Sequence, residues 1–462
     1  MNYPEALQYI YGFADLERGV GFSDRSPARY RFQRIGHLLR EIGDPHQRLR
    51  IAHVAGSNGK GSTSAMLASI AAAAGLRVGL YTQPHLHTFR ERIMVNAQPI
   101  APDEFANRMD KLAAAVAAGR QRHPAEGDPT TYEIATAVAF QYFADAGVDL
   151  AVIEVGMGGT WDATNVVDPT VSVITSLSLE HTAILGNTLE AIAGEKAGII
   201  KASRPVVTVP QAPAAMQVIE KRARDLAAPL EVVGTGDRSP LDSDGEIGWA
   251  AGRPAMSARL QMDGQCFDLQ MPLVGAHQLL NAAAAVAAAR ALGPDLAEIK
   301  PAHIARGLAS TVWPARFELI EHNPRVIVDA AHSPDAIRQT AVTLAALAPG
   351  PVQIVFGTAA DKDVAAMLHG IAPAASRAYV CASRHPRAAP PADLLESAAA
   401  IGRPALAFDS VAAALAAARE AAGPEGTVLV TGSIFVAAAA REAGGLAAEV
   451  DPPVLFGAVP TR

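Results

Sequence analysis

The sequence has little cysteine and no long run of apolar residues. Two cysteines, Cys266 and Cys381, occur among 462 residues, far apart and in unlike contexts, so a disulfide framework is not expected and a reducing compartment fits. The first residues, MNYPEALQYIYGF, lack the basic start and the apolar core of a signal peptide. The alanine-rich run 282–289 is too short to span a bilayer. These absences predict a cytoplasmic protein with no membrane partner.

The sequence also lacks a strong excess of either charge. The formal net charge is −7, and acidic and basic residues are mixed along the chain. General nucleic-acid binding needs a basic face, so it is not expected, and an anionic substrate must be met by local cations. The chain length of 462 residues exceeds what one hydrophobic core usually supports. Apolar residues make up 50 % of the chain, so a large part of it can be buried. We therefore expect two domains with large buried cores.

Short apolar runs alternate with helical stretches through residues 1–296, which we take as the first domain. We expect strands at 49–55, 78–82, 150–155, 171–177 and 205–209, with helices such as 132–146, 189–199 and 277–292. Continuous apolar runs of this length are typical of parallel strands that are covered on both faces. The segment 230–271 differs, because it is rich in turn residues and has alternating stretches, and it predicts a β-hairpin insertion.

A second α/β series follows in residues 297–462. Its expected strands are 326–329, 352–356, 378–381, 405–408 and 428–430, again with helices between them. This alternation is typical of a doubly wound sheet. The sequence therefore predicts an α/β fold, in which a doubly wound, mostly parallel sheet domain is followed by a smaller Rossmann-like domain.

The motif HVAGSNGKGST joins the first expected strand to a helical stretch through a glycine-rich turn. Such turns direct backbone N–H groups and a helix N-terminus toward a phosphate. Lys60 can reach β- and γ-phosphate oxygens, and Ser62 or Thr63 can offer a hydroxyl to Mg²⁺. The spacing from Gly56 to Gly59 is not that of the commonest P-loop, and an ordinary turn is the alternative.

Two further polar segments follow expected strands. In LAVIEVGMGGTWDATN, Glu154 ends a strand at the edge where parallel sheets bind ligands, so it is a candidate Mg²⁺ ligand, or else the partner of a lysine or helix N-terminus. In QPHLHTFRERI, two histidines with Arg90 and Arg92 predict either an anion-binding loop or a charged surface.

The segment LEHTAILGNTLEAIAGEKAGIIK places Glu180 and His181 after another strand. Their position near the expected phosphate site makes His181 a candidate metal ligand, although a lone histidine at such an edge is more often structural. By spacing alone, Lys196 belongs to a solvated helix face.

The second domain contributes WPARFE, VDAAHSPDA, GTAADKD and TGSIF. Arg316 lies near the junction of the domains, where it can reach a phosphate in a cleft. Asp329 ends a strand and can bind ribose hydroxyls, or it can cap the helix that begins after Pro334.

Taken in order, these segments resemble the folylpolyglutamate synthase/dihydrofolate synthase family of the Mur ligase superfamily. The resemblance runs from about residue 28 to about residue 440. It includes HVAGSNGKGST, PHLHTFRERI, EVGMGGTWDATN and HTAILGNTLEAIAGEKAGI, and later HQLLNAAAA, PARFE, DAAHSPDA, DKD and TGS.

The resemblance implies a role for each matching residue. The loop residues Gly56, Asn58, Gly59, Lys60, Gly61, Ser62 and Thr63 would hold the phosphates of ATP, with Asn281 near the adenine and Arg316 and Asp329 binding ATP from the second domain. Mg²⁺ ions would be surrounded by Ser62, Glu154 and His181, and Lys196 matches a lysine that is carbamylated in the family. His332 and Ser433 match positions associated with the incoming glutamate, so the catalytic candidates are Lys60, His181, Lys196 and His332.

Three departures from the family pattern occur. Ser57 stands where threonine is common, and Ser333 replaces a common asparagine. Gln83 stands where the family often has a metal-binding serine, so its amide oxygen or a water would complete that metal shell.

The implied activity is that of an ATP-dependent amide ligase. It would add L-glutamate to dihydropteroate, to the γ-carboxylate of a folate, or to both, through an acyl phosphate, and the family pattern favours a monomer. The alternatives are another Mur-type amino-acid ligase with a different acceptor and an ATP-binding switch without ligation. The folate-like motifs, and the mere 50 or so residues before the phosphate loop, favour the folate branch over a ligase with a nucleotide-sugar domain.

Overall fold

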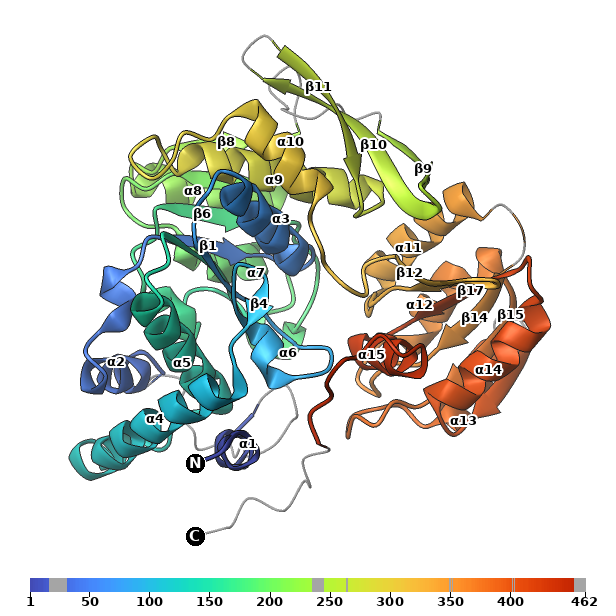
Figure 1. Cartoon of the computed structure of the whole chain (residues 1–462), viewed down its shortest axis with the longest axis horizontal. Coiled ribbons are helices and arrows are strands. Elements are labelled where there is room, and N and C mark those ends of the chain that lie inside the picture. The colour runs from blue at the N-terminus through green and yellow to red at the C-terminus, as the bar shows by residue number, and fades with distance from the viewer. Residues whose placement is uncertain are drawn as a thin grey trace.

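The computed structural model describes residues 1–15, 31–234, 245–262, 265–348, 350, 352–400, 402 and 404–452. The chain forms two α/β lobes, each built around its own sheet, with an antiparallel β-sheet extending along one side of the pair (Figure 1). Within these ranges no helix combines the length and the hydropathy needed to cross a bilayer. The expected α/β class is confirmed.

The larger sheet has eight strands in the order β4-β3-β2-β5-β1-β6-β7-β8. They are β1 (Ile51–Ala55), β2 (Val78–Tyr81), β3 (Ile93–Val95), β4 (Gln98–Pro99), β5 (Leu150–Glu154), β6 (Val171–Ile174), β7 (Val206–Thr208) and β8 (Leu230–Val232). Only β3 and β4 are antiparallel to their neighbours. Because the other strands are parallel, the polar loops after β1, β2, β5 and β6 begin at one edge of the sheet.

Helices cover both faces of this sheet. Side chains of a strand alternate between the two faces of the sheet. On one face, Ala52 and Val54 of β1 pack in one core with α3 (Lys60–Ala73) and α9 (Ala276–Ala291). Ile51 packs in a second core, which α2 (Arg31–Glu41), α4 (Pro102–Arg122) and α5 (Thr131–Asp145) complete. The remaining helices of this lobe are α1 (Tyr3–Tyr11), α6 (Thr182–Leu185), α7 (Leu189–Lys196) and α8 (Pro213–Asp225). A side chain on either face of a strand is therefore buried, which is why the strands read as continuous apolar runs.

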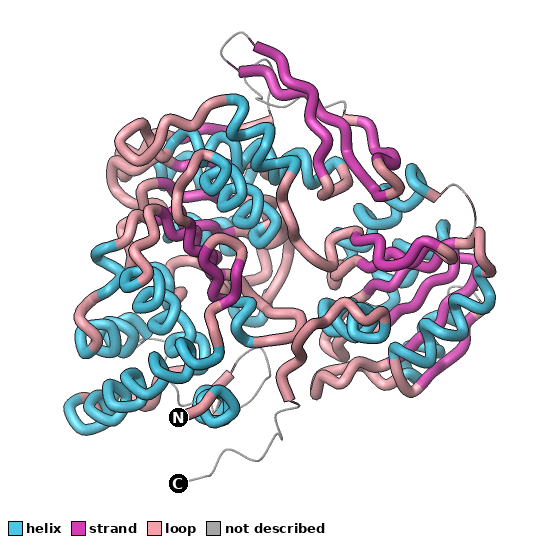
Figure 2. The backbone as a smooth tube through the Cα atoms, viewed as in Figure 1, coloured by secondary structure: helices cyan, strands magenta, loops and turns pink. Residues whose placement is uncertain are grey.

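The hairpin expected over 230–271 is a three-stranded antiparallel sheet. It consists of β9 (Glu246–Ala250), β10 (Arg253–Met262) and β11 (Gln265–Met271), and Figure 2 shows these strands reaching toward the second lobe. Residues 230–232 instead form β8, which pairs with β7 in the large sheet. The indole N–H of Trp249 in β9 donates to the Leu347 carbonyl of the second lobe at 3.1 Å, and Arg325 lies over the Trp249 ring.

The second lobe contains a six-stranded sheet in the order β12-β13-β17-β14-β15-β16. Its strands are β12 (Glu318–His322), β13 (Arg325–Val328), β14 (Val352–Phe356), β15 (Ala375–Cys381), β16 (Ala405–Phe408) and β17 (Thr427–Thr431). Its helices are α11 (Pro334–Leu347), α12 (Val364–Ile371), α13 (Pro391–Ala400), α14 (Val411–Ala422) and α15 (Ile434–Ala443). Five strands are parallel and β12 is antiparallel, so this sheet also has a ligand edge at its carboxyl ends.

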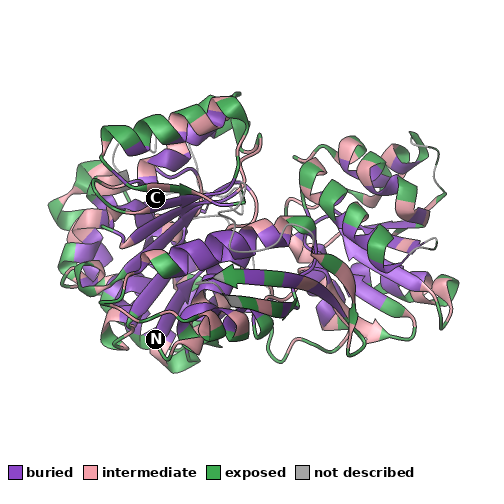
Figure 3. Ribbon diagram, turned by 90° about the horizontal axis from the view of Figure 1, so that it is seen from above, coloured by how far each residue is buried: buried purple, intermediate pink, exposed green. Residues whose placement is uncertain are grey.

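The chain between β11 and β12 packs on the first lobe before it enters the second lobe. Helix α10 (Pro301–Ala309) packs on α3, and a Cβ atom at Gly307 would lie 2.5 Å from the Ile70 Cα atom. The Ser69 hydroxyl donates to the Gly307 carbonyl at 2.7 Å. Figure 3 shows that the strands of both sheets are largely buried, whereas exposed residues lie on the outer helices and loops.

Candidate functional site

The phosphate loop lies between β1 and α3, as its motif predicts. Gly59 has a φ of 85° and precedes the first helical residue, Lys60. A Cβ atom at Gly56 would lie 1.8 Å from Thr175 Oγ1, and one at Gly59 would lie 2.2 Å from Asn281 Oδ1. Both glycines are therefore required by close approach, and Asn281 of α9 lies against the loop itself.

The Lys60 ammonium group folds back over the loop. Its Nζ atom donates to the carbonyls of Gly56 at 2.9 Å and Ser57 at 3.2 Å. These are neutral acceptors, so an anionic phosphate would attract the ammonium group more strongly. The next two hydroxyls, Ser62 and Thr63, are buried at the start of α3. Among the described residues, Thr63 Oγ1 has no hydrogen-bond partner, whereas Ser62 Oγ accepts from Gln278 Nε2 at 3.4 Å.

Glu154, the last residue of β5, is a buried carboxylate near these cations. Burial raises its pKa to about 7, although Lys60, the Gln83 N–H and Arg316 act in the opposite direction. The Gln83 N–H donates to Glu154 Oε2 at 3.3 Å. The Gln83 amide group lies over Gly156, where a Cβ atom would come within 2.5 Å of its nitrogen. Gln83 and Glu154, predicted from separate motifs, therefore meet at one edge of the sheet.

The glycine-rich turn after Glu154 is fixed by a buried acid. Asp162 Oδ2 accepts the N–H groups of Gly156 and Met157, each at 3.0 Å. Its Oδ1 atom accepts from Thr164 and from the Tyr132 hydroxyl. Burial raises the pKa of Asp162, and these hydrogen bonds oppose that rise. Asp162 thus shapes the turn beside Glu154.

Lys196 is buried and does not lie on a solvated helix face. Its Nζ atom donates to Glu180 Oε1 and to the Gly56 carbonyl, both at 2.8 Å. Burial lowers the pKa of Lys196 to about 8, against the opposing effect of Glu180. Burial raises the pKa of Glu180, but Lys60 and Lys196 outweigh it and lower that pKa to about 2. The expectation based on spacing alone was wrong because α7 turns this residue toward the phosphate loop.

His181 precedes α6 in the left-handed conformation, with a φ of 48°. Its side chain is exposed to solvent, while Lys362 of the second lobe and Lys60 lie within electrostatic range. Partial burial lowers its pKa, Glu180 raises it, and the lysines lower it further. His181 therefore stands where groups from both lobes meet.

Arg316 joins the second lobe electrostatically to Glu154 of the first lobe, and Asp329 lies beside Arg316. Arg316 interacts electrostatically with Asp329 and Glu154, and burial lowers its pKa. The Asp329 carboxylate accepts from the N–H groups of Phe317 and Ala331, each at 3.0 Å, and from the Thr340 hydroxyl at 2.8 Å. Asp329 does not cap the following helix, because Ser333 occupies that position.

His332 and Ser433 lie on neighbouring loops at the carboxyl edge of the second sheet. The Gly432 N–H donates to the Ala331 carbonyl at 3.1 Å, which joins the two loops. Burial lowers the pKa of His332, whereas the hydrogen bond to the Ala330 carbonyl and the charge of Glu180 in the first lobe raise it. The Ser433 hydroxyl caps α15 by accepting from the N–H groups of Phe435 and Val436.

Sequence reasoning missed Trp313 and Gln278. A Cβ atom at Gly61 would lie 2.9 Å from the Trp313 ring, so the connecting segment covers the start of α3. Gln278 bridges Ser62 and Asn281, accepting from Asn281 Nδ2 at 2.9 Å. Trp313 opens the WPARFE segment and Gln278 lies in HQLLNAAAA, so these two motifs were the available signals.

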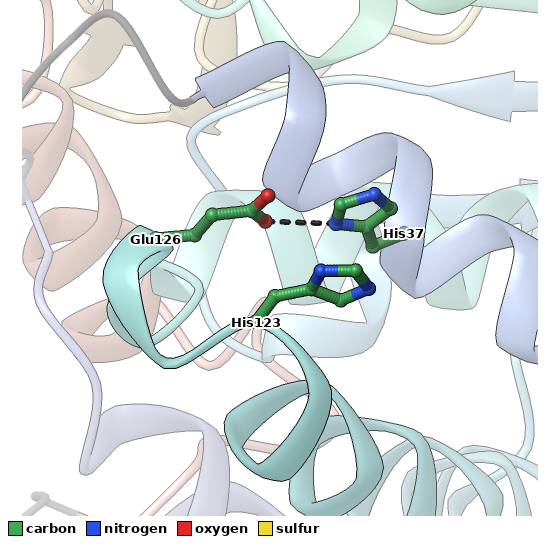
Figure 4. A group of neighbouring side chains, drawn as sticks. All are labelled: His37, His123 and Glu126. Carbon is green, nitrogen blue, oxygen red and sulfur yellow. Dashed lines mark hydrogen bonds and ion pairs between the residues drawn. The ribbon is translucent and has the colours of Figure 1, made fainter.

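A separate group of potential metal ligands lies on α2 and at the end of α4. The ligand atoms of His37, His123 and Glu126 are within 4.8 Å of one another. His37 Nδ1 pairs with Glu126 Oε2 at 2.9 Å, and the two rings stack with centroids 3.6 Å apart and planes 14° apart (Figure 4). Lone pairs of parallel stacked rings run side by side and do not converge on one point. The group is therefore a hydrogen-bonded stack that joins the two helices.

Known protein families match both lobes. Residues 54–289 match the Mur ligase middle domain, and residues 315–434 match the Mur ligase glutamate ligase domain. The chain is 36 % identical over 456 residues to the folylpolyglutamate synthase of Lacticaseibacillus casei, covering 96 % of this chain and 98 % of that protein. It is 37 % identical over 368 residues to the dihydrofolate synthase/folylpolyglutamate synthase of Bacillus subtilis, covering 79 % and 84 %.

A further relative is longer. The chain spans 50 % of a Haloferax volcanii protein named as a probable bifunctional folylpolyglutamate synthase/dihydropteroate synthase, with 38 % identity over 450 residues and 96 % of this chain covered.

Solved structures agree with these matches. A Mycobacterium tuberculosis folylpolyglutamate synthase complexed with ADP superposes with a TM-score of 0.84 at 30 % identity, covering 96 % of this chain and 98 % of that one. A structure titled as an FPGS-AMPPCP-folate complex has a TM-score of 0.80 at 34 % identity, covering 96 % and 99 %. The chain belongs to the folylpolyglutamate synthase family of Mur ligases.

Proposed function

We propose that this protein is an ATP-dependent ligase that joins L-glutamate to a folate-type carboxylate, either dihydropteroate or the γ-carboxylate of a folate. The observation that carries the proposal is the convergence of a phosphate loop, a buried carboxylate and cations from both lobes. An amide does not form readily from a carboxylate and an amine, because the carboxylate oxygen is a poor leaving group. Phosphorylation of the acceptor carboxylate by ATP removes that obstacle.

In this proposal the first lobe binds the triphosphate. The N-terminus of α3 and the loop from Gly56 to Thr63 receive the phosphates, and Lys60 leaves the Gly56 and Ser57 carbonyls to neutralise the β- and γ-phosphates. Asn281 supports the loop at Gly59, while Arg316 and Asp329 contact the nucleotide from the second lobe.

The donor set beside the loop fits Mg²⁺. Glu154 supplies a carboxylate whose pKa is raised because burial disfavours its charge. A bound cation would stabilise that charge. Ser62 and Gln83 supply neutral oxygens, and His181 lies at the same edge as a candidate ligand. Carboxylate and neutral oxygens suit this ion, and the imidazole is the least typical member of the set. When bound, Mg²⁺ would neutralise charge on the phosphates.

The chain's own residues then have distinct tasks. The first lobe holds the acceptor carboxylate in line with the γ-phosphate, and positioning of this kind can contribute up to about 7–11 kcal/mol. The product is an acyl phosphate, from which the glutamate amine displaces phosphate through a tetrahedral intermediate. Closure of the two lobes excludes the water that would hydrolyse the acyl phosphate. His332 and Ser433 occupy the second-sheet edge from which glutamate would approach.

Lys196 has a special place in the proposal. Because its pKa is lowered to about 8, about half of the Lys196 side chains are neutral amines at that pH. A neutral amine can add CO₂ and release a proton to give a carbamate. The carbamate is anionic, so the present ion pair between Lys196 and Glu180 would have to break. Incubation with ¹³C-labelled bicarbonate should give a carbamate NMR signal in the wild type that Lys196→Arg abolishes.

A phosphate-release assay tests the function directly. Release should require ATP, L-glutamate and an acceptor, with dihydropteroate and tetrahydrofolate tested separately. Release with neither acceptor, but with another carboxylate and an amino acid, would indicate a different Mur-type ligase. Nucleotide binding without amino-acid-dependent release would contradict the ligase proposal altogether.

A further inference from the structure

The described residues after α15, 444–452, leave the second lobe and contact the first one at Asp451 (Figure 1). The Asp451 backbone N–H donates to the His87 carbonyl at 2.9 Å. The Asp451 carboxylate accepts from the Phe89 N–H at 2.6 Å and from the Tyr3 hydroxyl at 2.9 Å. One residue thus ties the end of the second lobe to α1 and to the loop 83–92.

Other contacts hold the same loop from the second lobe. Arg441 of α15 donates from Nε to His87 Nε2 at 3.3 Å, and it also pairs with Glu318 of β12. Leu86 packs against the apolar core of the second lobe. Glu449, two residues before Asp451, forms an ion pair with Arg90. Loop 83–92 is therefore held from both sides, because Phe89 packs in the core of the first lobe while His87, Leu86 and Arg90 contact the second lobe and the segment that follows it.

Hydrogen bonds within loop 83–92 hold its backbone in one conformation. The Glu91 carboxylate accepts the N–H groups of Leu86, His87 and Thr88 at 2.8–3.0 Å. At one end the Thr82 N–H donates to the Arg92 carbonyl at 3.1 Å. The first residue of the loop, Gln83, donates to Glu154. The hydrogen bonds of the loop therefore link His87 to the contact between Gln83 and Glu154.

We propose that Asp451 and His87 are positioning residues that couple the placement of the second lobe to the Gln83–Glu154 edge. This role rests on the proposed function only in so far as that edge holds the ion that accompanies ATP. When the second lobe moves, α15 and the segment 449–451 move loop 83–92, so the edge takes its working arrangement in one placement of the lobes. Neither residue touches the reacting groups.

Hydrogen exchange measured by mass spectrometry tests the structural part. Asp451→Ala should speed exchange in peptides covering 83–88, because the loop loses its anchor, and Asp451→Asn should restore much of the protection, since its amide oxygen still accepts. Tyr3→Phe removes a single donor and should have a smaller effect in the same direction. Glu425→Ala, on the exposed turn before β17, is the matched control. Unchanged exchange in both Asp451→Ala and Tyr3→Phe would overturn the proposal.

Steady-state kinetics test the coupling. In Asp451→Ala the Mg²⁺ concentration for half-maximal glutamate-dependent phosphate release should rise by about 10-fold, the equivalent of about 1.4 kcal/mol. The KM for glutamate should change less than the Mg²⁺ requirement, and Asp451→Asn should recover most of the loss. Faster exchange with an unchanged Mg²⁺ requirement would overturn the coupling. If the wild type does not ligate glutamate, the proposed function fails, while the exchange measurements still decide whether Asp451 holds the loop.

Discussion

At the scale of single residues, the site depends on charges that are buried before any ligand arrives. Lys60, Lys196, Glu154 and Glu180 lie close together around the phosphate loop, and each has a partner that a bound nucleotide would alter. Buried charges are costly unless they are paired. The ion pairs and hydrogen bonds among these residues therefore stabilise the ligand-free arrangement. We therefore expect some substitutions among these residues to change the rate of ligation and others to change the free energy of unfolding.

Lys60→Ala should lower the rate of ligation by at least about 100-fold, as expected for loss of a group that stabilises developing charge. The fold should persist, because the ammonium group contacts only two loop carbonyls. Phosphate release and the circular dichroism spectrum of the variant would be compared with those of the wild type. Normal turnover in Lys60→Ala would remove this residue from the phosphate site.

Glu154 makes the stability of the metal-free protein depend on pH. Its pKa is about 7 in the folded state, against 4.5 as the reference value, so the folded state binds more protons between these pH values. The free energy of unfolding should therefore fall as pH rises from about 4.5 to 7, by about 3 kcal/mol for a shift of about 2.5 pH units.

Urea unfolding with EDTA at pH 5 and pH 8 measures this effect. Glu154→Gln should lessen the difference between the two pH values by about 2.5 kcal/mol, because the amide does not titrate. Glu220→Gln, an exposed position on α8, is the control and should behave as the wild type. Equal pH dependence in Glu154→Gln and the wild type would show that Glu154 does not carry the raised pKa.

The residues of the site differ in how well the sequence predicts them. Glu154 and Lys60 adjoin an apolar strand, and parallel strands share a ligand edge, so local pattern places them correctly. Lys196 looked solvated because nothing local shows that α7 turns it toward Gly56 and Glu180. Their roles in ATP and metal binding stay predictions.

At the scale of elements, backbone geometry at the start of α3 decides whether the loop can form. Gly59 combines a φ of 85° with a close approach to Asn281, whereas at Gly75, just after the same helix, φ is 92° but a Cβ atom would meet nothing within 4 Å. The pair separates two effects, because only Gly59 adds a steric clash to the backbone strain.

Gly75→Ala should cost about 1 kcal/mol through strain in the left-handed region. Gly59→Ala should cost more and should also weaken nucleotide binding, because Asn281 must move away from the loop. Thermal unfolding and the binding of a fluorescent ATP analogue give the two measurements. Equal losses of stability, with unchanged nucleotide binding in Gly59→Ala, would show that the Asn281 contact has no role in the loop.

Elements with a continuous apolar core were the easiest to predict. The strands β1, β5 and β14 appear where their apolar runs lie, with ends that differ by a few residues. The short strands β3, β4 and β8 were missed, since two to three residues give no period, and β12 was missed because its polar residues pair at a sheet edge. Tertiary pairing creates such strands, so the local sequence does not reveal them.

At the scale of the whole molecule, the proposed mechanism requires the two lobes to meet around the substrates. His181 interacts electrostatically with Lys362 of the second lobe, and Glu180 interacts in the same way with His332. Each lobe carries part of the machinery, so the sequence could predict the parts but not how far apart they stand. Domain placement depends on contacts such as those of Trp249 and Asp451, which join residues far apart in the chain.

Bound ligands should draw the lobes together. Small-angle X-ray scattering should give a smaller radius of gyration with a non-hydrolysable ATP analogue and an acceptor folate than for the free protein, because phosphates would attract cations from both lobes. A nucleotide analogue with an unrelated carboxylate serves as the control for ionic effects. An unchanged radius of gyration with both ligands bound would contradict closure.

The Trp249 contact has a consequence for the direction of such a movement. The indole reaches Leu347 from β9, while Asp451 contacts Tyr3 of α1, and β9 and α1 lie far apart in Figure 1. A contact that lies on the axis of a rotation keeps its geometry, whereas a contact far from the axis is displaced. A rotation of the second lobe about an axis through the Trp249 contact should therefore preserve that contact and displace the segment 449–451 together with loop 83–92.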